Sequence, residues 1–229
     1  MTVEEIRKKL MKKATIFHTG GFRPTYELGE SWFGKVSFKK EGETLPLDKD
    51  GNEMGALAMF FLDDLIMYPS VFKDKFMCSV FISYNLLDHR QDSKEYYCIR
   101  LYTKEDILVP CDWTFFDDGL SFPLSNEYID DYPAWDGEIP TDIFNELLRM
   151  ENEEGIDYYN DVCEESPYSI LHKIGGYPSY IQCGGGYDPN VEFVFQISSD
   201  PKCKFNIVND GNFYFYYVDN DWHLYWDFL

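Results

Sequence analysis

A Gly-Gly-x-Pro turn followed by two short runs of aromatic and β-branched residues is the feature that most limits how this chain can fold. The turn consists of Gly175, Gly176 and Pro178, and the runs lie at 191–200 and 212–217. Glycine reaches positive φ without steric cost and proline fixes its own φ, so the chain can leave a helix here and enter a sheet at a sharp angle. We therefore predict that this motif is scaffolding and has no catalytic role.

The same residue types recur along the chain and predict a protein built mainly of sheet. Its 229 residues include 19 Phe, 18 Tyr and 5 Trp, and aromatic and branched side chains suit a pleated surface better than a helix interior. Residues 110–140 are rich in Asp, Pro and aromatics without clear periodicity, and we expect ordered irregular structure with short strands there. Elsewhere, strands are predicted at 56–62, 76–84, 96–102, 191–197, 213–218 and 223–228, with a tight turn at Asn220 and Asp221.

The chain opens with the pattern of an amphipathic helix. Thr2 and Glu5 have the spacing of a capping box, and apolar residues recur at helical spacing after them. We expect this helix to end near Gly20 and Gly21, because Pro24 forbids its continuation and makes 18–26 a turn of fixed shape. Further helices are predicted over 141–155 and 156–165.

The order of these features repeats within the chain. Gly20, Gly21 and Pro24 match Gly175, Gly176 and Pro178, and each set is followed by strands rich in aromatics. Pseudo-repeat halves at about 15–105 and 170–229 indicate an internal duplication, with irregular and helical structure connecting them. The predicted fold class is α+β: two related antiparallel sheet units packed as one globule, a single domain over 1–229, with helices at the periphery.

The net charge limits the possible partners. It is −21, from 41 acidic and 20 basic residues, so the long-range field repels nucleic acid and anionic lipid and attracts cationic partners. Acidity for solubility alone is the alternative interpretation. The six cysteines have no C-x-x-C spacing, and no apolar stretch has the length of a signal peptide or a membrane span. We expect a cytoplasmic protein with reduced cysteines that binds neither nucleic acid nor membrane.

No motif in the chain carries recognisable chemistry. The loop beginning at Asp48 has Met59 where a calcium loop needs glutamate, so it is interpreted as a turn. Cys183 beside a glycine-rich loop, with His172 upstream, could pair as thiolate and base, but a buried core cysteine is the simpler interpretation. The histidines lack metal-binding spacing. We predict no catalytic residue, no metal site and no cofactor.

Two groups of residues are candidates for binding. Gln196, Asp200 and Asn212 are polar residues at or near the ends of aromatic strands, where they form either a structural hydrogen-bond network or a ligand contact. The second group mixes acids with aromatics, as binding surfaces do, or is an acidic loop whose aromatics are core. It consists of Tyr128, Asp130, Asp131, Tyr132 and Trp135.

Three segments resemble the YwqG-like family, a group of bacterial proteins of largely unknown function. They are HKIGGYPSYIQ at 172–182, FVFQISSD at 193–200 with GNFYF at 211–215, and LPLDKDGNEM at 45–54. The chain departs from the family at 57–61, where Leu-Ala-Met-Phe-Phe replaces a Leu-Ala-Gln-Ile-Asn type of strand. The resemblance implies an α+β fold and offers no established catalytic residues. Some members lie beside toxins as candidate immunity proteins.

Two functions from different classes fit these observations. The first is a non-enzymatic interaction protein, such as an immunity factor whose acidic surface binds a cationic toxin. The second is a small-ligand-binding protein or a hydrolase with an aromatic-lined cleft. A toxin gene beside this one favours the first function, and a metabolic operon favours the second.

Overall fold

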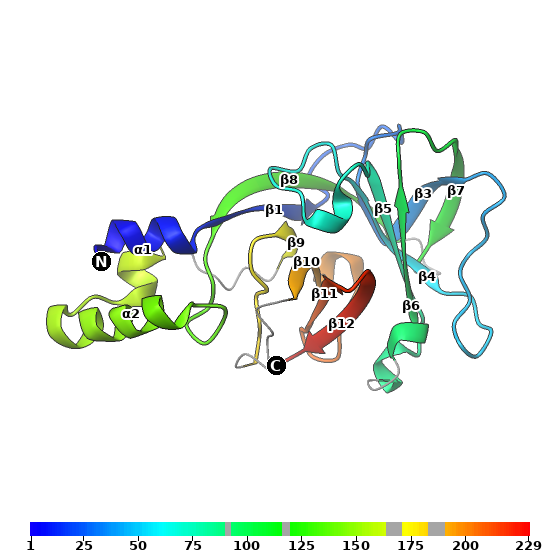
Figure 1. The fold of residues 1–229 in the computed structure, drawn as a ribbon. Helices are drawn as coiled ribbons and strands as arrows, with labels where there is room; N and C mark the ends of the chain where they lie inside the picture. Colours follow the sequence, from blue (N-terminus) through cyan, green and yellow to red (C-terminus); the bar gives the residue numbers. More distant parts are fainter. Residues whose placement is uncertain (90–92, 116–119, 164–170, 183–190) are drawn as a thin grey trace.

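The computed structural model describes residues 1–89, 93–115, 120–163, 171–182 and 191–229. Two helices, α1 (Val3–Leu10) and α2 (Thr141–Glu154), lie at one end of the molecule, beside a curled sheet (Figure 1). The strands of this ten-stranded sheet are β1 (Lys12–Thr19), β2 (Trp32–Phe33), β4 (Gly55–Phe61), β5 (Met77–Ile82), β6 (Tyr97–Tyr102), β8 (Phe122–Asp131), β9 (His172–Gly175), β10 (Glu192–Ser198), β11 (Asn212–Val218) and β12 (Asp221–Asp227). A separate two-stranded sheet pairs β3 (Lys35–Lys40) with β7 (Leu108–Thr114).

The large sheet is antiparallel throughout and has the order β12-β11-β10-β9-β1-β8-β2-β4-β5-β6. Its centre is the pairing of β1 with β8, which runs from Lys12 opposite Asp131 to Thr19 opposite Leu124. The curl brings the two edge strands together, because the hydroxyl of Tyr97 on β6 donates to the carbonyl of Trp222 on β12 at 2.7 Å. The sheet therefore curls around a single interior, which its inner face lines.

The inner face of the sheet encloses the largest apolar core. Phe60 of β4 and the stacked pair of Phe195 and Phe215, with ring centroids 4.4 Å apart, bring the two ends of the sheet into contact. Strand residues alternate between the two faces of the sheet, so the residues next to these inward-pointing rings in sequence point outward. On the β4–β6 end, β3 and β7 cover this outer face and bury Met59 and Phe81. On the β9–β12 end, the outer face carries buried polar side chains together with an aromatic cluster that includes Phe193, Tyr214 and Tyr216.

The helices form a separate apolar cluster. Ile6 of α1 and Leu147 of α2 pack with Val162, which belongs to one turn of π-helix at Tyr158–Val162. The predicted capping box at Thr2 is confirmed, and so is the end of α2 at Gly155, where φ is 73°. None of the described helices is long and apolar enough to cross a membrane. The described chain is therefore mostly antiparallel sheet with few helices, as predicted.

Several sequence predictions were wrong about particular elements. The opening helix ends at Leu10, and 12–19 form β1, because the run from Ala14 to Phe17 is buried between β8 and β9. Residues 122–131 form one ten-residue strand at the centre of the sheet, where only short strands were expected. The Gly-Gly turn follows directly on strand β9, where the end of a helix was expected. The last hairpin turns at 219–220, where both residues have positive φ, one position earlier than predicted.

The predicted conformation of the glycine turns is confirmed. Gly20, Gly21, Gly175 and Gly176 all have positive φ. At Gly176 the surroundings also exclude a side chain, because a Cβ atom would overlap the Oδ2 atom of Asp131 and lie 2.9 Å from the Cβ atom of Ala14. The turn after β9 therefore requires glycine for its backbone angle and for its close approach to β8.

Gly176→Val should destabilise the protein by more than about 3 kcal/mol, because it adds a clash with Asp131 to the left-handed strain. Gly155→Val is the matched control, since Gly155 has a similar φ of 73° and nothing within 4 Å of its Cβ position. Its expected cost is the strain alone, about 1–3 kcal/mol. Urea unfolding measures both. Equal losses in the two variants would contradict the close approach at Gly176.

Candidate functional site

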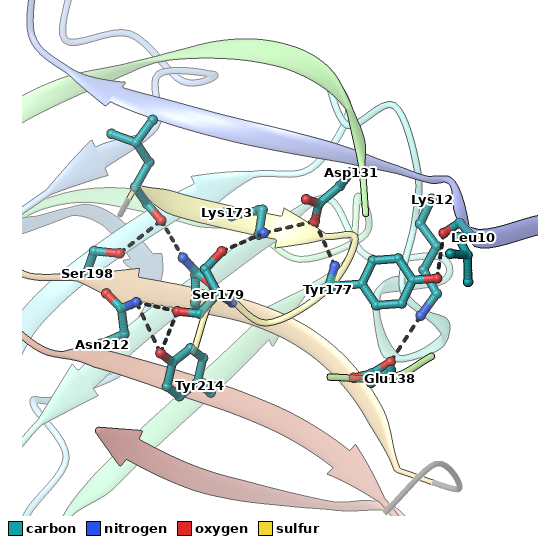
Figure 2. Close-up of polar contacts among 12 residues, drawn as sticks. Leu10, Lys12, Asp131, Glu138, Lys173, Tyr177, Ser179, Ser198, Asn212 and Tyr214 are labelled. Atoms are coloured by element: carbon teal, nitrogen blue, oxygen red, sulfur yellow. Dashed lines mark hydrogen bonds and ion pairs between the residues drawn. The ribbon is translucent and has the colours of Figure 1, made fainter. Parts of the chain in front are cut away.

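The segment 177–182 lies against the outer face of β9–β12. A buried polar network, part of which is drawn in Figure 2, holds it there. Its side chains come from different strands and are each no more than 4% exposed. They are Asp131 of β8, Lys173 of β9, Gln196 of β10, Asn212 and Tyr214 of β11, and Asp227 of β12. The network thus includes three residues that the sequence marked as binding candidates.

The ion pair between Lys173 and Asp131 is the charged centre of this network. Lys173 Nζ lies 2.8 Å from Asp131 Oδ2 and donates to the Oγ atom of Ser179 at 2.9 Å. Asp131 Oδ2 also accepts the backbone N–H of Tyr177 at 2.8 Å. A buried charge without a partner is strongly destabilising, so both side chains are confined to this arrangement. The pair therefore holds the Gly-Gly turn against β8.

Gln196, Asn212 and Asp227 bind the backbone of the same segment. Gln196 Oε1 accepts the N–H of Ser179 at 2.9 Å, and its Nε2 donates to the carbonyl of Leu171 at 2.9 Å. Asn212 Nδ2 donates to the carbonyl of Ser179 at 3.0 Å, and Asp227 Oδ2 accepts the N–H groups of residues 181 and 182 at 3.0 Å. These contacts match the predicted structural network for Gln196 and Asn212.

Tyr177 connects the network to the helical end of the molecule (Figure 2). Its hydroxyl donates to the carbonyl of Leu10, the last residue of α1, at 2.6 Å. Lys12 Nζ lies 3.9 Å from the centroid of the Tyr177 ring and 3.4 Å from Glu138 Oε2. The segment after the Gly-Gly turn therefore also positions α1 relative to the sheet.

Lys173→Met should cost about 3–5 kcal/mol of unfolding free energy, because it leaves the Asp131 carboxylate buried without its counter-charge. The double variant Lys173→Met with Asp131→Asn should lose less than the single variant, since no charge is then buried and an acceptor remains for the Tyr177 N–H. Denaturant unfolding of both proteins makes the comparison. The ion pair would lose its assigned role if the double variant were the less stable of the two.

Asp200 lies apart from this network, at a cavity of about 270 Å³ between β1 and the end of β10. Its carboxylate accepts the hydroxyl of Thr19 and the backbone N–H groups of residues 202 and 203, and it lies 3.5 Å from His172 Nε2. Burial favours a raised pKa for Asp200, but hydrogen bonds from His172 and Thr19 outweigh it and hold the pKa well below its usual range. Asp200 is therefore ionised and fully engaged.

His172 is also engaged at both ring nitrogens. Its Nδ1 accepts the backbone N–H of Ser198 at 3.2 Å, so the proton resides on Nε2, which faces Asp200. The ring stacks on Phe33 with centroids 4.3 Å apart. A general base needs a free lone pair directed at its substrate. The pair of His172 and Asp200 therefore holds β9 to the β10 turn and offers no base to the cavity.

Asp200→Asn should reduce stability by about 1–3 kcal/mol at pH 7, because hydrogen bonds to a carboxylate are stronger than those to an amide. The pKa of Asp200 is lower in the folded state than in the unfolded chain, so this stabilisation is complete above about pH 4 and declines as the pH falls further. Urea unfolding of both proteins between pH 7 and pH 3 gives the difference. A difference that does not change with pH would contradict the charged interaction.

Tyr128 and Asp130 lie on an exposed surface that the sequence identified only in part. Tyr128 is 51% exposed, and its hydroxyl donates to the carbonyl of Asp64 at 2.7 Å, in the loop between β4 and β5. Asp130 is exposed and pairs with Lys13. The loop adds exposed apolar residues beside them. We call the whole set the aromatic-acidic surface: Asp63, Asp64, Ile66, Met67, Tyr68, Tyr128 and Asp130.

The other three members of the predicted group lie elsewhere. Asp131 points to the opposite face of β8 from Asp130, as strand alternation requires, and is buried in the polar network. Tyr132 and Trp135 are partly buried against the helix cluster. The predicted group is therefore divided among three environments. The contribution of 63–68 was missed, although an acid pair followed by Leu-Ile-Met-Tyr before Pro69 is a signal for an apolar loop at the surface.

The described cysteines and acids form no reactive centre. Cys78, Cys98, Cys111, Cys163 and Cys203 are free, and burial raises the pKa of Cys163 to about 11. Cys183 and the adjoining glycine-rich loop lie outside the described residues. Within 1–89, 93–115, 120–163, 171–182 and 191–229, no cluster of His, Cys, Asp or Glu is arranged to hold a metal ion.

Comparison with profiles of known protein families gives no match for this chain, and comparison with curated proteins also gives none. The resemblance of 172–182 and 193–200 to the YwqG-like family therefore remains a proposal that rests on those motifs.

Proposed function

We propose that this chain is a non-enzymatic interaction protein that binds a basic protein partner through its aromatic-acidic surface, in the manner of an immunity protein that binds a toxin. The observation that carries this proposal is the exposure of Tyr68 and Tyr128, at 47% and 51%, beside Asp63, Asp64 and Asp130. Exposed aromatics supply binding energy, and the acidic rim on a chain of net charge −21 attracts a cationic partner.

The surface is held in a fixed conformation by the sheet beneath it. The N–H of Ile66 donates to the Oγ1 atom of Thr15 on β1 at 3.2 Å, and the Tyr68 hydroxyl donates to the carbonyl of Asp63 at 3.1 Å. Partial burial and the nearby carboxylates of Asp63 and Asp64 raise the pKa of Tyr68. A rigid loop loses little conformational entropy on binding. Asp63 pairs with Lys104 and Asp130 pairs with Lys13, so the attraction to a basic partner comes from Asp64 and from the net charge of −21.

The alternative function is binding or hydrolysis of a small ligand at the cavity beside Asp200. Its volume of about 270 Å³ and the polar side chains of His18, Ser198 and Lys202 in its lining favour this alternative. The engagement of both nitrogens of His172 weighs against hydrolysis there. Gene neighbourhood separates the two proposals, since the interaction protein is expected beside a toxin gene and the ligand-binding protein in a metabolic operon.

We also propose that the two three-stranded units β4-β5-β6 and β10-β11-β12 arose by duplication. Each has one β-bulge in its first strand, at 56–58 in β4 and at 193–195 in β10. Aligning the bulges equates Ala58 with Phe195, two positions from the alignment that the sequence suggests. Superposition of the units through these bulges tests the proposal, since unrelated units would not align over all three strands.

The basic product of a gene beside this one should bind the purified chain with an association rate that falls steeply with salt. Tyr68→Ala and Tyr128→Ala should each weaken binding by about 1–2 kcal/mol, because each removes an exposed aromatic contact. Leu47→Ala is the matched control, since Leu47 is also an exposed apolar residue, at 59%, but is not part of the aromatic-acidic surface. Leu47 precedes the start of β4, whereas the loop 62–70 follows the end of that strand. Surface plasmon resonance measures the affinities. Equal effects of all three variants would exclude this surface.

A further inference from the structure

A second cavity, of about 180 Å³, lies at the helical end of the molecule. Its apolar floor includes Leu147 of α2, which is buried, and Ile156 after that helix. Three aromatic side chains, Trp135, Tyr158 and Tyr159, line its walls. An engineered apolar cavity of about 150 Å³ admits benzene, so this cavity has room for a short alkyl chain with a polar head.

The three rings pack against one another and are held in place. The centroids of Trp135 and Tyr158 are 5.3 Å apart with an interplanar angle of 57°, and those of Tyr158 and Tyr159 are 5.2 Å apart at 71°. The Tyr159 hydroxyl accepts the backbone N–H of Trp135 at 3.0 Å, and the Tyr158 hydroxyl donates to the carbonyl of Pro133 at 2.8 Å. These contacts fix the three lining rings relative to one another.

The rim of the cavity is acidic. Glu151 of α2 and Asp157 before the π-turn are both exposed and line the cavity. Asp157 is fixed there because its Oδ1 accepts the N–H of Asn160 at 2.8 Å. Among the described residues, no basic side chain lines the cavity. Aromatic faces and carboxylates both attract a cation, so the chemistry of the lining selects a positively charged group.

We propose that this cavity binds an alkylammonium group, supplied in the complex by a lysine side chain of the basic partner. Lysine combines an apolar stem, which fits the aromatic walls, with a compact ammonium that can reach the carboxylates of Glu151 and Asp157. The assignment to a partner lysine rests on the proposed function. The ammonium chemistry rests on the lining alone and can be tested without a partner.

Titration with n-butylammonium chloride, followed by NMR of the Trp135 indole N–H, tests the ammonium site, and Trp135→Phe identifies that resonance. We expect binding in the millimolar range, as for a small isolated fragment. The neutral isostere 1-butanol should bind at least about fivefold more weakly, because it lacks the charge. Equal binding of the alcohol, or no binding of butylammonium, would overturn the proposal.

Charge-neutralising variants locate the site without removing the fold. Glu151→Gln and Asp157→Asn should each weaken butylammonium binding about threefold, and asparagine retains the capping oxygen at 157. Glu153→Gln is the matched control, since Glu153 is also on α2 but pairs with Arg149 and does not line the cavity. An effect of the control equal to the others would show only a general loss of charge and overturn the site.

The partner assignment has its own test. Trp135→Phe should weaken binding of the basic neighbouring gene product at least about fivefold if its lysine enters the cavity. Unchanged partner affinity in that variant would overturn the lysine assignment. Loss of the proposed function would have a different signature, because Tyr68→Ala and Tyr128→Ala would then leave partner binding unchanged while butylammonium still bound at Trp135.

Discussion

The buried ion pair between Lys173 and Asp131 is the interaction on which the rest of the structure depends. It joins β9 to β8 across the central strand β1, and its carboxylate also holds the turn at Gly176 through the Tyr177 N–H. Neither charge can be buried without the other, so the relative positions of these strands are specified to within hydrogen-bond distance. Burial of one face already specifies the register of neighbouring strands, and the ion pair adds a constraint between two strands that are not neighbours.

The polar network around this ion pair is structural and lies apart from the proposed binding surface. Gln196, Asn212 and Asp227 use their polar groups to hold 177–182 in place, and this leaves the outer face of β9–β12 covered. The exposed aromatic residues of the proposed binding surface lie elsewhere, Tyr68 on the loop 62–70 and Tyr128 on β8. Rigid support beneath an exposed loop reduces the entropic cost of binding. The polar network therefore stabilises the sheet on which the proposed binding surface is carried.

Local patterns predicted much of the fold, and long-range contacts account for what was missed. The strands β4, β5, β6, β10, β11 and β12 follow from their aromatic and branched residues, and α2 from its apolar spacing and Gly155. Strand β1 was mistaken for helix, because its burial between β8 and β9 overrides local periodicity. The surface at Tyr128 depends on its contact with Asp64, which is 64 residues away in sequence. No local pattern reports such a contact.

Native-state amide hydrogen exchange tests the central claim most directly, because the N–H groups of Tyr177, Ser179, Ile181 and Gln182 are each bound by a side chain of the network. If the network is the constraint that fixes the fold, these amides exchange as slowly as those of β10, through global unfolding. Exchange of 177–182 by local opening, while β10 stays protected, would contradict this account.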